Sequence, residues 1–200
     1  MGVNRKGRFA AITNVRESGM FTKARLSRGK LPQEFLAGDE PPETFVERIG
    51  PHAEDYAGFN LLIGDSAGLL FYSNRQAGLM QIADGVHGVS NGLFDENWPK
   101  LVSGKQALAT ALETRPDKDE LMQILTDNTI AHDHHLPDTG VALEVERMLS
   151  SRFIRSADYG TRACSVVMFN SQDSVSFVEQ NYIDAETIGV LVLEQFEIVA

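Results

Sequence analysis

The chain has 200 residues, the size of one domain when a domain holds about 150. It carries 18 Lys and Arg against 28 Asp and Glu, a formal net charge of −10. This acidity excludes a general binder of nucleic-acid phosphates or of anionic membrane surfaces. Hydrophobic residues make up 42% and charged residues 23%, which is typical of a globular domain rather than a disordered chain.

The sequence carries no recognisable targeting signal. Its basic start is not followed by the apolar segment of a signal peptide, and no apolar run is long enough to predict a membrane span. A single cysteine cannot form an internal disulfide, which favours a reducing compartment. We therefore expect a cytoplasmic protein without a membrane span.

In the first half of the chain, strands and irregular segments dominate. A strand is expected over 8–15, where apolar and β-branched residues are frequent. Residues 17–43 contain several Gly and Pro and are expected to be irregular, while 43–56 favour a short helix interrupted by a Gly-Pro pair. Two apolar runs within 59–74 predict a β-hairpin, and 81–90 predicts another pair of short strands.

The second half predicts helices followed by strands. Residues 99–113 and 117–126 place leucines at helical spacing, and 141–150 predicts a further helical turn. Strands are expected over 163–170, 174–179 and 189–199. The order of strands, helices and strands indicates an α+β fold with a largely antiparallel sheet, in a single domain over 1–200.

Residues 64–68 read Gly-Asp-Ser-Ala-Gly and match the pattern around the nucleophilic serine of α/β-hydrolases. That turn needs a helix after the serine, whereas the strand-forming run 69–72 follows Ser66. A hairpin turn explains the match better, and an esterase centred on Ser66 remains a third, unrelated interpretation.

Two further groups have reactive side chains. His132, His134 and His135 lie beside Asp133, but their spacing is too tight for one tetrahedral metal site, so a solvated loop is favoured and no metal or cofactor is predicted. Cys164 lies inside a predicted strand and is expected to be buried and unreactive.

Short polar clusters recur along the chain, and four of them place Asn or Arg at the end of a predicted strand. Side chains at such ends can converge on a cleft, although turn chemistry explains each Asn singly. The clusters lie at 13–16, 56–60, 72–75, 88–91, 98–100 and 159–162.

Taken together, these clusters resemble the NRDE family, also called the transport and Golgi organisation protein 2 family. The resemblance runs in order across almost the whole chain. It rests on residues 7–16, 27–29, 56–64, 72–75, 90–91, 98–100, 136–140, Glu144 with Arg147, and 159–162.

The resemblance implies an αββα sandwich of the N-terminal-nucleophile-hydrolase type. In that superfamily the first residue of the mature chain, often Cys, is the nucleophile, and its α-amine serves as the base. Small-molecule amides are the usual substrates. Eukaryotic members of the family are linked to Golgi organisation, secretion, mitochondrial lipid metabolism and haem handling.

The start of this chain departs from the family pattern. Members begin with Met-Cys and carry an Asn-Arg-Asp-Glu segment after a strand, whereas this sequence begins Met1-Gly2-Val3. We expect an N-terminally truncated form of the fold, either from a start codon assigned too far downstream or from a shortened paralogue. Loss of the first strands would expose a sheet edge and promote self-association.

Six residues are predicted to form the site by analogy with the superfamily. Asn91 is the first choice for an oxyanion donor and Asn14 the second, and Arg162 would stabilise a thiolate as a supporting catalytic residue. Substrate binding is assigned to Asn14, Arg16, Asn60 and Asn74. The competing explanations are a turn residue for Asn91 and a surface or structural ion pair for Arg162.

Two functions follow from the resemblance. The first is an amidohydrolase when the chain is full length, lacking its nucleophile as written. The alternative is a non-enzymatic binding or trafficking protein that handles haem or acyl metabolites. Both imply a small-molecule ligand as the partner.

Overall fold

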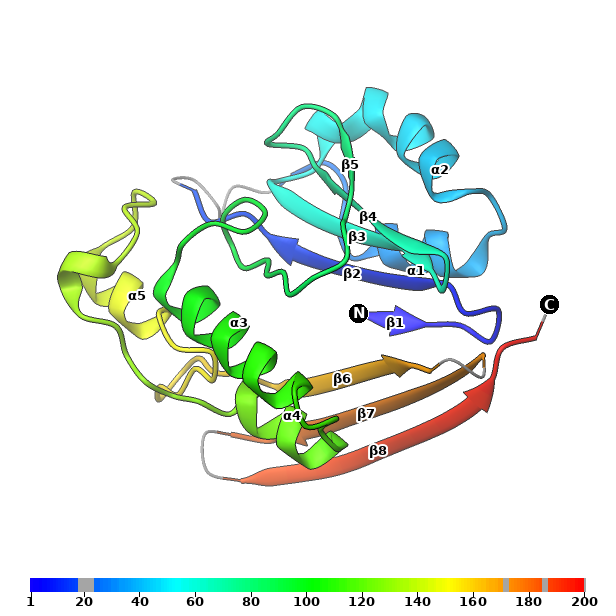
Figure 1. The fold of residues 1–200 in the computed structure, drawn as a ribbon. Helices are drawn as coiled ribbons and strands as arrows, with labels where there is room; N and C mark the ends of the chain where they lie inside the picture. The colour runs from blue at the N-terminus through cyan, green and yellow to red at the C-terminus, as the bar shows by residue number, and fades with distance from the viewer. Residues whose placement is uncertain (18–23, 171–172, 185–186, 200) are drawn as a thin grey trace. The chain divides into compact units, whose positions relative to one another are not determined.

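A computed structural model describes residues 1–17, 24–170, 173–184 and 187–199. The chain forms two compact units, one made of residues 1–96 with Ile198 and Val199, the other of Asn97–Glu197. Each unit holds one antiparallel sheet with helices on it (Figure 1). The prediction of a single domain over 1–200 stays a prediction.

The first unit contains a five-stranded sheet in the order β1-β2-β3-β4-β5, in which every neighbouring pair is antiparallel. Its strands are β1 (Gly2–Val3), β2 (Phe9–Asn14), β3 (Phe59–Asp65), β4 (Gly68–Ser73) and β5 (Leu79–Gln81). Between β2 and β3 the chain forms the helices α1 (Lys30–Ala37) and α2 (Pro42–Ile49) and the 3-10 helix η1 (Gly50–Asp55).

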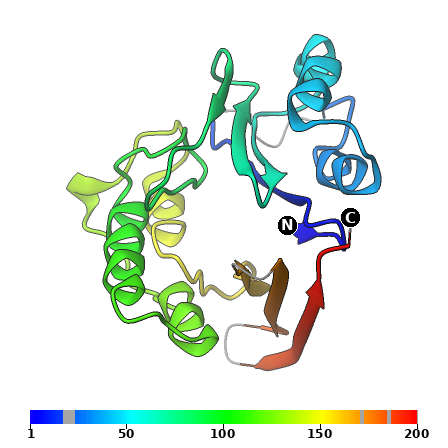
Figure 2. The ribbon, with the colours of Figure 1, turned by 45° about the vertical axis from the view of Figure 1, so that its right-hand side comes forward.

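Alternation along the strands decides which face of this sheet the helices cover. Phe59, Leu61 and Ile63 of β3 are fully buried and form one core with Phe35 of α1 and Phe45 of α2. Because successive strand residues point to opposite faces, Asn60 and its even-numbered neighbours face away from these helices. Figure 2 shows both helices on the same side of the sheet.

The Arg8 side chain connects the first sheet to α1 by hydrogen bonds and a ring contact. Its guanidinium lies 3.9 Å from the centre of the Phe35 ring and donates to the backbone oxygens of Phe35 and Glu40. The side chain is almost completely buried, so these bonds satisfy a charge that burial would otherwise destabilise.

The second unit contains a three-stranded antiparallel sheet, and all of its described helices precede that sheet in the chain. The helices are α3 (Pro99–Leu112), α4 (Lys118–Leu125), the short η2 (Asp133–His135) and α5 (Leu143–Met148). The strands are β6 (Ala163–Phe169), β7 (Ser174–Tyr182) and β8 (Ile188–Glu197), in the order β6-β7-β8. In both views α3 and α4 lie side by side, and α4 packs on β6 (Figures 1 and 2).

The structure confirms the mixed composition and the antiparallel sheets, and it corrects two predicted segments. Residues 17–43 were expected to be irregular, but α1 and the start of α2 fall within this range. Over 81–90 two strands were expected, whereas β5 ends at Gln81 and no further strand begins before α3 among the described residues. None of the described helices is long and apolar enough to cross a membrane.

Candidate functional site

A row of polar side chains crosses the end of the first sheet on the face away from α1 and α2. Thr13 on β2 pairs with Asn60 on β3, and Asn60 pairs with Ser73 on β4. Directly paired residues of antiparallel strands point to the same face, so the three side chains lie in one row. Asn60 and Ser73 are buried, and Thr13 is half-buried.

The segment Ser90–Gly92, between β5 and α3, is bonded onto this row. The Thr13 hydroxyl donates to the Ser90 oxygen at 2.6 Å, and the Asn60 amide donates to the Gly92 oxygen at 2.6 Å. The Asn91 amide donates to the Asn14 oxygen at 2.9 Å, and the Arg16 backbone N–H donates to the Asn91 oxygen at 2.6 Å. We call Thr13, Asn60 and Ser90–Gly92 the polar cluster.

The amide of Asn60 is only half satisfied. Its Nδ2 donates to the Gly92 oxygen and, at 3.2 Å, to the Thr13 hydroxyl oxygen, which fixes the orientation of the amide. Turning the amide over would bring two acceptor oxygens together. Its Oδ1 is buried and has no donor within the part of the chain that the structure describes. Leaving a buried acceptor unpaired costs about 1–3 kcal/mol.

Four of the six predicted site residues therefore meet at one place. Asn14, Arg16 and Asn60 come from the ends of β2 and β3, and Asn91 comes from the segment bonded to them. Asn91 is half-buried, and Arg16 is buried. Asn14 takes part through its backbone oxygen and exposes its side chain.

Asn74 lies next to this row but has a different arrangement. Its Oδ1 accepts the Phe59 backbone N–H at 2.8 Å, and its Nδ2 donates to the Ala53 oxygen at 2.9 Å and, more weakly, to the Tyr56 oxygen. These bonds join β3 to the end of η1. The geometry indicates a structural joint, although Asn74 as a binding residue stays a prediction.

Charged side chains beside the polar cluster are paired. Arg75 donates to both carboxylate oxygens of Glu17, at 2.7 and 2.8 Å, and this hydrogen bonding holds the pKa of Glu17 below its usual range. Arg28 donates to the Gly58 oxygen at 2.7 Å, and burial lowers the pKa of its guanidinium. The Gly58 oxygen also accepts the Val15 N–H, which ties β2 to the start of β3.

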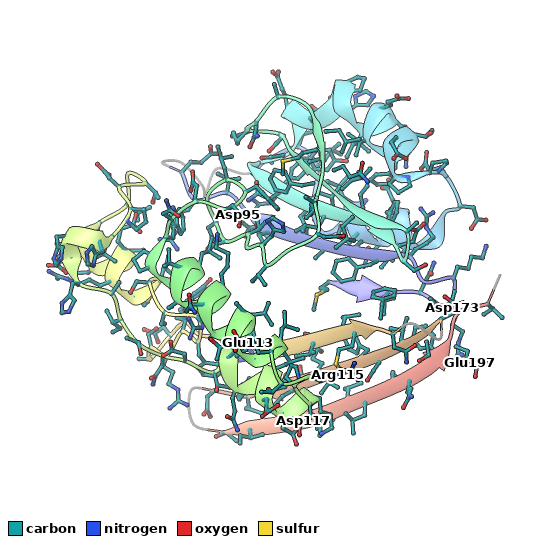
Figure 3. All side chains as sticks on the ribbon, viewed as in Figure 1. Asp95, Glu113, Arg115, Asp117, Asp173 and Glu197 are labelled. Atoms are coloured by element: carbon teal, nitrogen blue, oxygen red, sulfur yellow. The ribbon has the colours of Figure 1, made fainter. Side chains whose placement is uncertain are left out.

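The loop that carries Ser90–Gly92 is closed at its base by Asp95. One carboxylate oxygen lies 2.6 Å from Nδ1 of His87, and the other accepts the Gly88 N–H at 2.9 Å. Phe94 packs against Phe71 of β4, with 5.1 Å between ring centres. Figure 3 labels Asp95 in this loop. The polar cluster is thus built from a sheet end and a braced loop.

Arg162 lies in the other unit. It is exposed, donates to the Ile183 oxygen at 2.7 Å and accepts the Tyr182 N–H through its own backbone oxygen. These bonds join the start of β6 to the end of β7. The side-chain acceptor is a backbone oxygen and not the carboxylate of an ion pair. Both interpretations of Arg162, a supporting catalytic residue and an ion pair, stay predictions.

The other reactive side chains have unfavourable settings for catalysis. Ser66 is exposed in the hairpin turn between β3 and β4, so a strand and not a helix follows it. Cys164 is buried as predicted, and desolvation raises the pKa of its thiol. Asp133 is held by Arg147 at 2.6 and 2.7 Å, and the described residues contain no group of three potential ligands placed to hold a metal ion.

The polar cluster offers a pattern suited to amide recognition. Asn60 presents an oxygen that needs a donor, while the Asn91 amide uses one N–H on Asn14 and has a second N–H in its chemical structure. An amide ligand carries both an N–H donor and a carbonyl acceptor.

Comparison with known proteins relates most of the chain to one family. The family model for transport and Golgi organisation 2 matches residues 1–184. This chain belongs to that family. It is 28% identical to the transport and Golgi organization protein 2 homologs of cattle and of humans, over 93% of this chain and 72% of each relative. The mouse homolog is also 28% identical, over 94% of this chain and 73% of its own length.

The match to the transport and Golgi organisation 2 family contains the whole polar cluster. Sequence reasoning found Asn60 and Asn91 but did not single out Thr13, Ser90 or Gly92 as site residues. Thr13 and Ser90 belong to the polar clusters at 13–16 and 88–91, and their position at the ends of predicted strands was the available signal. Gly92 contributes only a backbone oxygen, which no side-chain pattern could indicate.

Proposed function

We propose that the chain binds a small molecule carrying an amide group at the polar cluster of its first unit. The observation that carries this proposal is the buried Oδ1 of Asn60, for which the described residues provide no donor. Native proteins pair such atoms with protein, water or ligand, and a ligand N–H would supply the missing hydrogen bond. The fixed orientation of the Asn60 amide makes the site selective for a donor group.

A second residue supports an amide rather than a simple hydroxyl ligand. The half-buried Asn91 is held by Asn14 on one side and, through its own backbone oxygen, by Arg16 on the other. Its amide is therefore positioned before a ligand arrives, which reduces the entropy lost on binding. The remaining N–H of Asn91 would donate to the carbonyl of the same ligand amide.

The test compares N-methylacetamide with methyl acetate, which has a similar shape but no N–H. Binding is followed by chemical-shift changes of the isotope-labelled chain. We expect N-methylacetamide to shift the backbone resonances of Asn60 and Gly92 with saturation, and methyl acetate to bind at least about tenfold more weakly, since one hydrogen bond contributes about 1 kcal/mol or more.

Two variants make the result specific. Asn60→Leu should abolish the difference between the two probes, while Asn128→Leu, the same change at an exposed position of the second unit, should preserve it. If Asn60→Leu does not fold, Asn91→Ala at its half-buried position tests the carbonyl contact instead, and it should weaken the binding of both probes to a similar extent. Equal binding of both probes, or unchanged selectivity in a folded Asn60→Leu protein, would overturn the proposal.

Amide hydrolysis, which the family resemblance predicts, would use the same recognition. Hydrolysis of N-methylacetamide adds water across the C–N bond and releases acetate and methylamine. Both products are visible in the same spectra as the bound probe. In a chain extended to begin with the Met-Cys of the family, their accumulation in proportion to protein concentration would favour the amidohydrolase, and stable bound probe would favour the binding protein.

Other features of the proposal rest on the family alone. The two sheets, each with helices on it, are compatible with the αββα sandwich of N-terminal-nucleophile hydrolases. The names of the cattle, mouse and human relatives refer to transport and Golgi organisation, a role that a ligand-binding protein can serve. Handling of haem or acyl metabolites is an expectation of the same kind, as is a cytoplasmic location.

A further inference from the structure

The polar cluster contains the one place in the sequence where an asparagine precedes a glycine, at Asn91 and Gly92. In such a pair the backbone nitrogen of the glycine can attack Cγ of the asparagine, because glycine has no Cβ to hinder the approach and its backbone turns freely. The new N–Cγ bond closes a five-membered succinimide ring as the Cγ–Nδ2 bond breaks and ammonia leaves. Water then opens the ring to aspartate or isoaspartate. The reaction consumes one water and releases one ammonia, and no oxidant or reductant takes part.

Hydrogen bonds hold both residues of this pair. The Asn91 carbonyl oxygen accepts the Arg16 backbone N–H at 2.6 Å, and the Gly92 oxygen accepts the Asn60 amide at 2.6 Å. The Asn91 side chain donates through Nδ2 to the Asn14 oxygen at 2.9 Å. Attack on Cγ needs this side chain to leave Asn14 and the following peptide group to rotate, which separates the carbonyl oxygen from Arg16. The folded segment therefore restrains the reaction until these bonds break.

Thr13 holds the same segment one residue earlier. Its hydroxyl donates to the Ser90 oxygen at 2.6 Å and accepts from the Asn60 amide at 3.2 Å. Ser90 is buried, whereas Asn91 and Gly92 are half-buried. Local opening of a loop requires less free energy than global unfolding. Such an opening gives both the rotation that the attack needs and access for the water that opens the ring.

Conversion of Asn91 removes a donor on which the polar cluster depends. In aspartate a carboxylate oxygen replaces Nδ2 and faces the Asn14 oxygen, so two acceptors meet where one hydrogen bond existed. In isoaspartate the backbone also gains one carbon atom, which displaces the Gly92 oxygen from the Asn60 amide. Either product therefore loosens the segment from the ends of the strands.

We propose that Asn91 is a site of spontaneous deamidation, restrained by the polar cluster, and that its conversion ends ligand binding there. The first part rests on the Asn-Gly pair and the hydrogen bonds that hold it. The second part rests on the proposed function, in which the Asn91 side chain donates to the carbonyl of an amide ligand. The binding capacity of the chain then declines as the protein ages.

The experiment incubates the folded chain near neutral pH and follows the conversion of Asn91 by peptide mapping with mass spectrometry. A synthetic peptide of residues 86–97 gives the rate without the fold. We expect the folded chain to react at least about tenfold more slowly than the peptide, because several hydrogen bonds must break first. The same chain unfolded in guanidinium chloride should react as fast as the peptide.

A variant that loosens the segment tests the restraint. Thr13→Val removes the hydroxyl that holds Ser90 and keeps the side-chain shape, so it should accelerate the conversion about threefold or more. Thr110→Val makes the same change at an exposed position of α3 and should leave the rate unchanged. Equal rates in the folded chain and the peptide, no product at Asn91 once the peptide is fully converted, or equal rates in the two folded variants would overturn the deamidation site. The comparison with the unfolded chain needs no variant, so it decides the matter if Thr13→Val does not fold.

Binding of N-methylacetamide tests the second part. We expect the fresh chain to bind this probe and the converted chain to lose the binding, as should Asn91→Asp, which reproduces one product. Binding retained by the converted chain and by Asn91→Asp would overturn the second part. A fresh chain that does not bind the probe would overturn the proposed function and the second part together. The deamidation site would still be decided by its own rates, because these are measured without a ligand.

Discussion

Gly64 on β3 occupies a position where no side chain fits. A Cβ built there would lie 2.1 Å from the backbone oxygen of Gly68 on the neighbouring strand β4. Backbone atoms of a paired strand cannot move aside as a flexible side chain can. The identity of this residue is therefore fixed by the close approach of two strands just before their connecting turn.

Gly64→Ala should lower the free energy of unfolding by at least about 2 kcal/mol, because overpacking against a strand forces the backbone to shift. The control is Gly50→Ala, at a helical backbone conformation with open space around the glycine, which we expect to be neutral or slightly stabilising. Urea unfolding of both variants measures the difference. Equal stabilities would show that the hairpin tolerates a methyl group.

The hydrogen bonds from Thr129 to Asp127 make the stability of the second unit depend on pH. Its hydroxyl and backbone N–H, together with Arg152, hold the pKa of Asp127 below its usual range. A carboxyl group whose pKa is lowered by folding stabilises the protein above its unfolded pKa of about 3.9, and this contribution is lost as the pH falls through the folded value.

Thr129→Val should therefore destabilise the protein at neutral pH and do so less in acid. The valine removes the hydroxyl donor while keeping the side-chain shape, so the variant loses a hydrogen bond that is stronger to ionised than to protonated Asp127. Urea unfolding at pH 7 and near pH 3 compares the two chains. A difference between them that stays constant with pH would contradict this assignment.

At the scale of elements, α4 begins with a reciprocal capping arrangement. The carboxylate of Asp117 accepts the backbone N–H groups of Asp119 and Glu120, both at 2.9 Å, and the Glu120 carboxylate accepts the Asp117 N–H at 3.1 Å. Figure 3 labels Asp117 where this helix starts. Because α4 packs on β6, its first turn supports the sheet of the second unit.

Replacing Asp117 with alanine should cost about 1 kcal/mol of unfolding free energy, the usual contribution of an N-cap side chain. Asp158→Ala removes the same charge from an exposed position outside helices and serves as the control. Thermal unfolding at neutral pH separates the two. An effect of the same size in both variants would assign the loss to net charge rather than to capping.

At the scale of the whole molecule, the strand β8 favours self-association. Within the described residues β8 pairs with β7 alone and is therefore an edge strand of the second sheet. Several of its apolar side chains are exposed, among them Ile188 at 69% and Val190 at 68%. Unpaired strand edges with apolar side chains are prone to pair with a second copy.

We expect the chain to associate through β8 as its concentration rises, and Val190→Lys to shift it towards the monomer by placing a charge on the edge strand. Val102→Lys, at an exposed position on α3, is the matched control and should associate as the original chain does. Light scattering coupled to size-exclusion chromatography measures the molar mass. A monomer at every concentration, or equal masses for both variants, would contradict the prediction.

Local sequence predicted most strands and helices. It failed where a helix-breaking residue lies at a position that a helix tolerates. Pro32 argued against a helix in residues 17–43, yet it lies in the first turn of α1, where a missing N–H breaks no helical hydrogen bond. In contrast, the apolar runs of β3 and β4 and the turn between them predicted the hairpin, because alternation and turn chemistry are local properties.

The sequence by itself determined the family, the antiparallel pairing of neighbouring strands and the burial of Cys164, since these depend on local patterns or on motifs in order. Only the tertiary structure joined Asn60 to Asn91, because 31 positions along the chain separate residues that meet through Gly92. It alone showed that Oδ1 of Asn60 has no donor among the described residues, since a missing hydrogen bond depends on all surrounding atoms. It likewise showed that the Asn74 side chain bonds to Phe59 and Ala53 and not within the polar cluster, although Asn60 and Asn74 both lie near strand ends.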